Sequence, residues 1–378
     1  MDNLTHSLVG LALGEIVDRA LPPAADPQRA RTRHRLLLTT GALASNFPDL
    51  DLVLTPLLAP PLGYLLHHRG HTHTLLYALP QLALLLGLMW LLWPGARRLL
   101  RDDRVARWAT LGTGALGMVL HLTFDSLNVY GVHPFHPFDS RWLYGDLIFI
   151  IEPVFWTALG IALALLVPGR TLRWAFAGLI VAASLVFAWL GFLQWGSLAA
   201  LLAVAAAVAF AMRHSPAAGL TTALLACVGF VALQAGAAHQ AREQIRAALV
   251  KAEPGSQVLD MPLSAFPSNP LCWSFAAITR DDGAGSYAVR IGVLSLAPDV
   301  TGVASCPARF GGEPGTDRTA LSWKYREGAS LAGLRALRSG NCHFDAWLRF
   351  ARVPSLVDGN ATRSEERRVG KECRSRWS

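Results

Sequence analysis

The chain has 378 residues, of which 52% are hydrophobic and only 16% are charged, and its mean hydropathy is +0.35. A soluble domain carries about a quarter charged residues, so this composition excludes a soluble globular protein. The formal net charge is +8, and it falls to +5 without residues 363–378, which hold six basic and three acidic residues. That value is ordinary for a membrane protein with basic loops and indicates no nucleic-acid partner.

The first segment, residues 1–20, is expected to form a helix capped by Asp2 or Asn3. It is too short and too acidic at its end to be predicted as a membrane span. It also has no positive charge at its start, so it does not resemble a cleavable signal peptide. A Pro- and Arg-rich link follows up to residue 35.

Apolar stretches of roughly 20 residues then follow one another, the length that a helix needs to cross the ~30 Å hydrocarbon core of a bilayer. If these stretches alternate in direction, the arginines of 29–35, 97–107, 170–173 and 213 share one side. The positive-inside rule places that side in the cytoplasm, which predicts a multi-pass protein of the bacterial inner membrane. The predicted spans are 36–56, 74–93, 107–127, 147–167, 173–193, 197–212 and 218–238.

Past residue 238 the chain changes to short alternating runs separated by Gly, Pro and Asp. We expect an amphipathic linker helix at 239–256 and a β-rich extracytoplasmic domain at 257–362, on the periplasmic side. The predicted fold class is mainly α, a polytopic membrane helical bundle over 1–238 with a small β-rich C-terminal soluble domain. Residues 363–378 resemble a translated vector or assembly scar, with a natural basic tail as the alternative.

The cysteines of the C-terminal domain would lie where disulfides form and persist. No CxxC spacing is present, which argues against a thiolate zinc site. Cys306 and Cys342 lie in loop-like settings, whereas Cys272 precedes Trp273 in a segment that looks buried. We therefore favour a Cys306–Cys342 bridge, with three reduced and buried cysteines as the alternative.

The motif HLTFD places His121 and Asp125 one helical turn apart, so that both can reach one metal ion. A buried His–Asp pair that bridges two helices is the alternative. The motif PDLD offers the carboxylates Asp49 and Asp51, which suit Mg²⁺, Mn²⁺ or Zn²⁺. A solvated loop with a helix cap would carry the same residues.

The motif HHRGHTHT is the densest metal-type cluster of the chain, and it includes His68 and His73. Arg69 in its centre could clamp a phosphate or carboxylate with its planar guanidinium group. A basic loop that binds lipid headgroups is the alternative. His6 is considered a candidate metal ligand only because, in the predicted topology, it lies on the same side as the other groups.

These residues carry a family resemblance. The segments THSLVGLALG, SNFPDLDLV, HRGHTHTLL, HLTFDSLNVYG and HPFDSRWLYGDLIFIIEP occur in that order over the first ~155 residues. Together they resemble the YdjM-type family of inner-membrane proteins, which are described as membrane-bound metal-dependent hydrolases. A more remote similarity to helical zinc-dependent phospholipase C would suggest phosphoester substrates. The resemblance implies metal ligation at His6, Asp49, Asp51, His68, His73, His121 and Asp125.

We therefore expect a hydrolase in which a divalent cation, Zn²⁺ first and Mg²⁺ or Mn²⁺ as alternatives, activates water. The substrate is expected to be a phosphoester or lipid-linked molecule at the outer membrane face, and membrane lipids are the expected partners. The oligomeric state is left open. The residues expected to act in catalysis are Asp49, Asp51, Arg69 and Asp146.

Two other classes of function use the same residues. A metal-stabilised scaffold or stress-response protein would need no open coordination position. A metal or proton transporter would need ionisable groups along a path through the membrane, and the predicted spans of 147–238 carry few of them. The sequence therefore favours the hydrolase.

Overall fold

The computed structural model describes residues 1–24, 26–57, 68–307, 319–348 and 351–354. The chain forms two compact units. The first contains Met1–Leu57, the described residues up to Gln234, and Pro267–Asn269; the second contains Ala235–Phe266 and the described residues from Pro270 onward. The segment 363–378, which we compared with a scar, lies outside the described residues.

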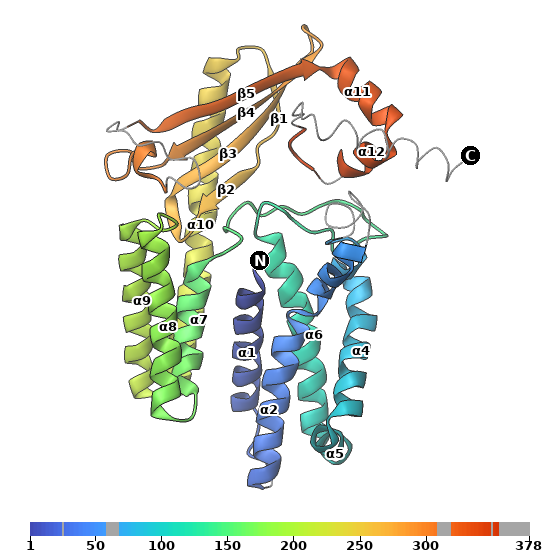
Figure 1. Cartoon of the computed structure of the whole chain (residues 1–378), viewed down its shortest axis with the longest axis vertical. Helices are drawn as coiled ribbons and strands as arrows, with labels where there is room; N and C mark the ends of the chain where they lie inside the picture. The colour runs from blue at the N-terminus through green and yellow to red at the C-terminus, as the bar shows by residue number, and fades with distance from the viewer. Residues whose placement is uncertain (25, 58–67, 308–318, 349–350, 355–378) are drawn as a thin grey trace, which may run out of the picture. The chain divides into compact units, whose positions relative to one another are not determined.

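The first part of the first unit brings helices α1, α2, α4 and α6 together (Figure 1). Between α2 and α4 the chain forms two short 3-10 helices, η1 and η2, and between α4 and α6 the short helix α5. The bounds are α1 Asn3–Ala20, α2 Pro27–Ala44, η1 Phe47–Leu57, η2 His71–His73, α4 Leu75–Leu92, α5 Pro94–Asp102 and α6 Arg104–Ser126.

Local chemistry explains where α1 and α2 begin. The side chain of Asp2 accepts a hydrogen bond from the backbone N–H of Thr5, as a residue at this position of a helix commonly does. Asp26 accepts from the N–H of Arg29 in the same way, and Pro27 occupies the first turn of α2, where its missing N–H is harmless.

A close backbone approach joins α1 to α2. A side chain at Gly10 would collide with the backbone of Gly41, and one at Gly14 with the carbonyl group of Leu37. Small residues allow helices to pack this closely in a membrane. The crossing therefore depends on glycines four residues apart on α1.

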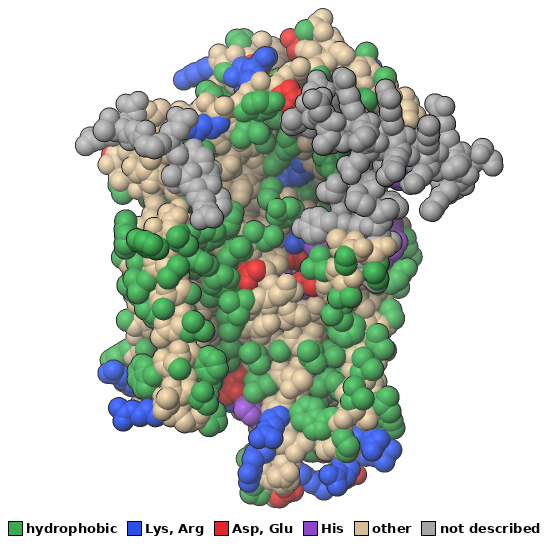
Figure 2. All heavy atoms as spheres, in the orientation of Figure 1, with side chains coloured by type: hydrophobic (Ala, Val, Ile, Leu, Met, Phe, Trp, Pro, Cys, Tyr) green, Lys and Arg blue, Asp and Glu red, His purple; other side chains and the backbone are tan. Residues whose placement is uncertain are grey.

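The second part of this unit contains α7 Pro153–Leu166, α8 Arg170–Trp189, α9 Trp195–His214 and the start of α10 Pro216–Ala252 (Figure 1). Helices α4, α8, α9 and α10 are long and apolar enough to cross a membrane, and α7 is a shorter apolar helix. These four confirm the predicted spans 74–93, 173–193, 197–212 and 218–238. Within this unit, Figure 2 shows Lys and Arg side chains gathered at the lower ends of the helices.

Two predicted spans are wrong in their bounds. The span 36–56 is not one helix, because α2 begins at Pro27 and ends at Ala44, and η1 starts at Phe47. The span 147–167 begins only at Pro153, after a loop. Residues 239–252, expected as a separate linker helix, continue α10 without a break.

The second unit carries an antiparallel five-stranded sheet, in the order β1-β3-β4-β5, with β2 paired to β3. The fold is thus mainly α, with a small β-rich part toward the C-terminus. The strands β3 and β4 form a hairpin in which Asp281 pairs with Ser286. The bounds are β1 Gln257–Asp260, β2 Leu263–Phe266, β3 Asn269–Asp281, β4 Ser286–Ser295, β5 Leu321–Ser330, α11 Leu331–Gly340 and α12 Cys342–Leu348.

The expected Cys306–Cys342 bridge is wrong. Cys306 instead forms a disulfide with Cys272, with a Cα–Cα distance of 5.9 Å. Cys272 is fully buried on β3, as expected, and it packs with Cys306, Phe266 and Val293 in one core cluster. Burial was taken as a sign of a reduced thiol, but a loop that folds onto the sheet brings its partner into the same core.

Candidate metal centre

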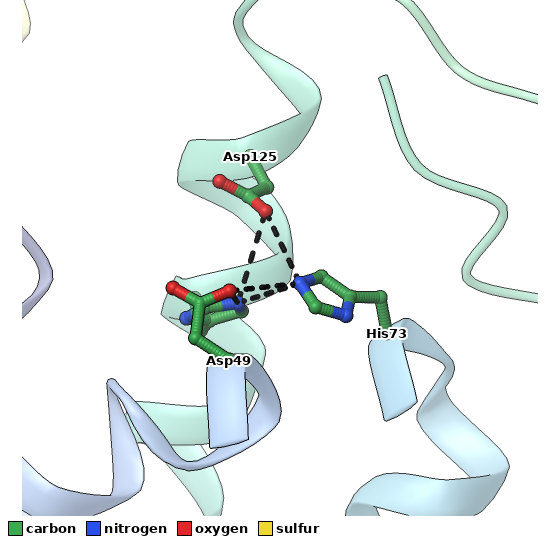
Figure 3. Close-up of side chains that lie close together, drawn as sticks. Asp49, His73 and Asp125 are labelled. Atoms are coloured by element: carbon green, nitrogen blue, oxygen red, sulfur yellow. Dashed lines mark hydrogen bonds and ion pairs between the residues drawn. The ribbon is translucent and has the colours of Figure 1, made fainter. Parts of the chain in front are cut away.

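Three segments far apart in the sequence bring their polar side chains together in the first unit. Asp49 comes from η1, His73 from η2, and His121 and Asp125 from one face of α6. Figure 3 shows Asp49, His73 and Asp125 pointing toward one another from these elements. His73, His121 and Asp125 are buried, and the Asp49 side chain is only 8% exposed.

We call Asp49, His73, His121 and Asp125 the four-donor set. The Nε2 atom of His73 lies 3.2 Å from Oδ1 of Asp49, 3.4 Å from Oδ2 of Asp125 and 3.2 Å from Nε2 of His121. The His121 Nε2 atom lies 3.7 Å from each of the same two carboxylate oxygens. These four residues could hold a metal ion.

The ring orientations of both histidines favour metal binding through Nε2. The His121 Nδ1–H donates to the backbone carbonyl of Ser45 at 2.7 Å. The Nδ1 atom of His73 lies 3.0 Å from the hydroxyl of Thr72, which itself donates to Asp51 at 2.7 Å. Because that hydroxyl hydrogen is donated to Asp51, the hydroxyl oxygen accepts a hydrogen bond from His73. The proton of the neutral His73 ring therefore lies on Nδ1. The two neutral rings thus present Nε2 lone pairs to the cluster, as metal-binding histidines do.

The spacing of the donors fits a tetrahedral ion. Metal–ligand bonds of 2.0–2.2 Å separate the ligand atoms by roughly 3.3–3.6 Å in a tetrahedron, and the five measured separations run from 3.2 to 3.7 Å. Among the described residues, the buried Oδ2 of Asp125 has no hydrogen-bond partner. Arg69 forms an ion pair with this oxygen at 3.2 Å, and a carboxylate oxygen has a second lone pair that a cation among these donors would use.

The net charge of the cluster also favours a bound cation. Asp49, Asp51 and Asp125 contribute three negative charges, and among the described residues the cationic groups that pair with them are Arg69 and the amino group of Met1. Arg69 Nη2 lies 3.2 Å from Asp125 Oδ2, and the Met1 amino group forms an ion pair with Asp125 Oδ1. With neutral histidines one negative charge remains in a buried site, where unpaired charge is unfavourable.

A second group of donors adjoins the first. Asp49, Asp51 and His68, which we call the three-donor set, also bring ligand atoms close enough to hold a metal ion. His68 Nδ1 lies 3.0 Å from Asp51 Oδ1, and the His68 side chain is 10% exposed. The two sets share Asp49, so together they form one continuous centre.

The remaining predicted residues take different positions. His6 is buried, its ring stacks on that of His121 with centroids 4.1 Å apart, and its Nε2 lies 3.4 Å from Asp125 Oδ1. It borders the four-donor set without belonging to it. Asp146 is buried with a positive φ of 56°, and its expected part in catalysis stays a prediction.

Arg69 contacts several groups beside the four-donor set. Besides its ion pair with Asp125, it donates to the backbone carbonyl of Gly131 at 3.0 Å and lies over the Tyr130 ring at 5.6 Å. Its side chain is buried, and its φ of 60° belongs to the left-handed region. In this structure Arg69 balances the charge of Asp125, and its expected role in clamping a substrate stays a prediction.

Sequence reasoning missed two groups that orient the ligands, namely the Ser45 carbonyl and the Thr72 hydroxyl. A backbone carbonyl leaves no signal in a sequence. Thr72 lies between His71 and His73 in the motif HTHT, and its position beside a ligand was a signal that could have been used.

The comparisons with known proteins cover the part of the chain that carries this site. The family model described as YdjM inner membrane protein matches residues 1–195, which include every residue of both donor sets. The uncharacterized protein YfhP of Bacillus subtilis (strain 168) is 32% identical over 154 residues, which make up 40% of this chain. The matched part spans about two fifths, 42%, of that relative's length. No solved structure matches. Because the family model covers more than half of the chain, the protein belongs to the YdjM inner membrane protein family.

Proposed function

We propose that this protein is a membrane-bound metal-dependent hydrolase that acts on a phosphoester or lipid-linked substrate. The observation that carries the proposal is the pair of donor sets that share Asp49. Hydrolases that use two metal ions hold them ~3.5–4 Å apart with shared ligands, and a shared carboxylate suits that arrangement. Membership of the YdjM family supports the membrane location but not the reaction.

The donor chemistry favours Zn²⁺ in the four-donor set, because two imidazoles and two carboxylates suit a borderline cation. Mg²⁺ and Mn²⁺ are the alternatives, and they fit the three-donor set better because only one of its three donors is an imidazole. A set of three protein ligands is typical of catalytic sites, since one coordination position stays open. We therefore assign the reaction to the side of the centre that contains His68.

When bound, a divalent ion would supply Lewis-acid activation of water and of the scissile group. The residues of the chain would hold and orient the ligands. Asp51 accepts hydrogen bonds from the Thr72 hydroxyl and from the backbone N–H of Arg69, and it contacts His68. This fixed carboxylate orients the His68 ring. Because His68 is partly exposed, an ion held by the three-donor set would lie on the side of the centre nearer to solvent.

A metal-stabilised scaffold is the second candidate, and one observation favours it. The four-donor set already has four protein donors, three of them buried, and closed four-ligand sites are typical of structural zinc. The same centre could therefore hold the helices together without any reaction. The two candidates differ in what happens when only the three-donor set is changed.

The test combines metal analysis with hydrolysis assays on the detergent-purified full chain. We expect His121→Ala and Asp125→Asn to lose bound metal and activity together, because each removes one donor. We expect His68→Ala to keep the ion of the four-donor set but to lose hydrolysis of a phosphodiester probe. His214→Ala, which changes an exposed histidine of α9, is the matched control.

Two results would decide against the hydrolase. Full metal occupancy in His121→Ala and Asp125→Asn would reject the metal assignment. Normal metal content without hydrolysis of phosphodiester or phospholipid substrates by the unaltered protein would favour the scaffold instead.

We also propose that the second unit is periplasmic. Support comes from the basic residues, which gather at one end of the helices of the first unit (Figure 2), and from the predicted alternation of the spans. The Cys272–Cys306 disulfide is a further argument, since such bonds persist in oxidising compartments.

A further inference from the structure

A large crevice lies in the first unit and shares no residue with the two donor sets. It is bounded by α1, α2, α7 and α8 and has a volume of about 750 Å³, and most of its wall is apolar. Leu4, Leu8 and Leu11 of α1 line it along the helix, opposite Trp156 of α7 and Ala183 of α8. Volumes of ~300–1,000 Å³ are typical of sites for small organic ligands.

One end of the crevice is charged. Its lining includes Glu15, Arg19 and His34, and all the other lining residues are uncharged. Glu15 accepts from Arg19 Nε at 2.6 Å and contacts His34 Nε2 at 2.7 Å. The Glu15 side chain is only 6% exposed, whereas those of Arg19 and His34 are 40% and 42% exposed. The crevice therefore presents the two nitrogen-bearing side chains at its mouth and keeps the carboxylate behind them.

Further basic groups surround this end. Val167 and Pro168 belong to the lining, and the guanidinium group of Arg173 reaches the carbonyl of Val167 at 3.5 Å. Figure 2 shows acidic and histidine side chains at the lower end of the hollow between α2 and α8, with Lys and Arg side chains on the helix ends around it. A negatively charged group at this end would face cations on several helices.

We propose that this crevice binds one phospholipid, with its phosphate at Arg19 and His34 and an acyl chain along the leucines of α1. The apolar wall belongs to helices of a membrane protein. Lipid acyl chains are therefore the apolar groups available to occupy the crevice. The charged end lies on the arginine-rich side, where phosphate headgroups of that leaflet would be. The proposal is independent of the metal centre, because the crevice and the two donor sets share no residue.

The apolar part of the site can be tested by filling it. Native mass spectrometry of the purified full chain, incubated with phosphatidylglycerol, measures bound lipid directly. Ala183→Trp should weaken binding by about tenfold or more, because a large side chain would occupy the chain's path. Ala182→Trp is the matched control, since Ala182 is the preceding residue of α8, is exposed and lies outside the lining.

The headgroup part is tested by comparing phosphatidylglycerol with diacylglycerol, which has the same chains but no phosphate. Arg19→Gln should weaken phosphatidylglycerol binding about fivefold, the equivalent of the ~1 kcal/mol that one such charge contributes, and should leave diacylglycerol binding unchanged. Arg29→Gln is the control, because Arg29 lies on the same basic side but outside the lining and pairs with Asp26.

Three results would overturn the proposal. Equal lipid binding by Ala183→Trp and Ala182→Trp would remove the crevice as the site. Equal binding of both lipids by the unaltered protein would remove the phosphate contact. Occupancy by detergent or by another protein alone, with no retained phospholipid, would reject a lipid as the occupant.

Discussion

At the scale of single residues, the Thr72 hydroxyl group sets the tautomer and ring orientation of the proposed ligand His73. Thr72 donates to Asp51 and lies beside His73 Nδ1, so it links the three-donor set to the four-donor set. Without it, the ring of His73 could rotate or take the other tautomer, and its Nε2 lone pair would no longer face Asp49. Partners of this kind typically change metal affinity by ~10–100-fold.

We therefore predict that Thr72→Val lowers metal affinity by roughly 10–100-fold, although Thr72 is not itself in either donor set. The valine keeps the shape of the side chain and removes only the hydroxyl group. Competition with a chelator, followed by metal analysis, measures the change. Thr72→Ser retains the hydroxyl and should bind metal almost normally; equal affinity in Val and Ser variants would show that the hydroxyl has no such role.

A second residue-scale prediction concerns Glu253 in the second unit. Burial raises the pKa of this carboxyl group, but hydrogen bonds from Thr279, Arg290 and Arg326 outweigh that effect, so the pKa lies below its ordinary value of 4.5. A lowered pKa in the folded state stabilises the protein above pH 4.5, and this stabilisation is lost as the pH falls through the folded-state pKa.

Glu253→Gln should therefore lower the free energy of unfolding at pH 7, and the difference from the unaltered protein should shrink below pH 4.5. Denaturant unfolding followed at several pH values measures this difference. Asp282→Asn, which changes an exposed carboxylate paired only with Arg280 among the described residues, is the control. A difference that stays constant from pH 7 to pH 3 would contradict the linkage.

At the scale of elements, the crossing of α1 and α2 positions the centre. Gly10 and Gly41 let the two backbones touch, and the α2 end leads directly through Ser45 into η1, which carries Asp49. A wider crossing would move η1 relative to α6. The metal centre thus depends on glycines that cannot bind the metal ion through a side chain.

Gly41→Ala should separate the two helices, because its Cβ would collide with the Gly10 carbonyl oxygen. We expect a loss of about 1–3 kcal/mol in stability, as for other overpacked sites, together with a lower metal content. Thermal unfolding in detergent and metal analysis measure both. Gly112→Ala, a position on α6 with nothing within 4 Å of the added atom, should leave both unchanged. If both variants behave alike, the crossing is not critical.

The sequence predicted elements well where one physical signal dominated. Long apolar runs predicted the helices α4, α8, α9 and α10, because a helix that crosses a bilayer needs about 20 apolar residues. The prediction was wrong for the start of α2, because the Pro- and Arg-rich sequence that begins near Pro27 was interpreted as a link between helices. In the structure Arg33 pairs with Asp18 of α1 at 2.7 Å, a contact between helices that no local pattern reveals.

The site was predictable only in part for the same reason. His121 and Asp125 follow from helical spacing on α6, and the other donors stood out as histidines and aspartates in short motifs. The ion pair of Arg69 with Asp125 could not be predicted, because it joins segments 56 positions apart. The Ser45 carbonyl has no side-chain signature at all.

At the scale of the whole molecule, the side on which each unit lies can be tested independently of its packing. Reporter fusions at residue 102, in the Arg97–Arg107 segment, should report a cytoplasmic position, and fusions after residue 255 a periplasmic one. The reason is the gathering of arginines at one end of the helices (Figure 2). A cytoplasmic signal from the second fusion would reverse the proposed orientation of the second unit.

The charged pairs between α1 and α2 have a consequence for how the protein enters the membrane. If α1 were inserted alone, Asp18 would face lipid without Arg33, and Glu15 would lose its contact with His34 and keep only Arg19 of its own helix, at a substantial free-energy cost. We expect the two helices to leave the translocon together as a hairpin, with their glycine crossing already formed. Maturation of the metal centre would then be a late step of biogenesis, since its remaining donors arrive only with η2 and α6.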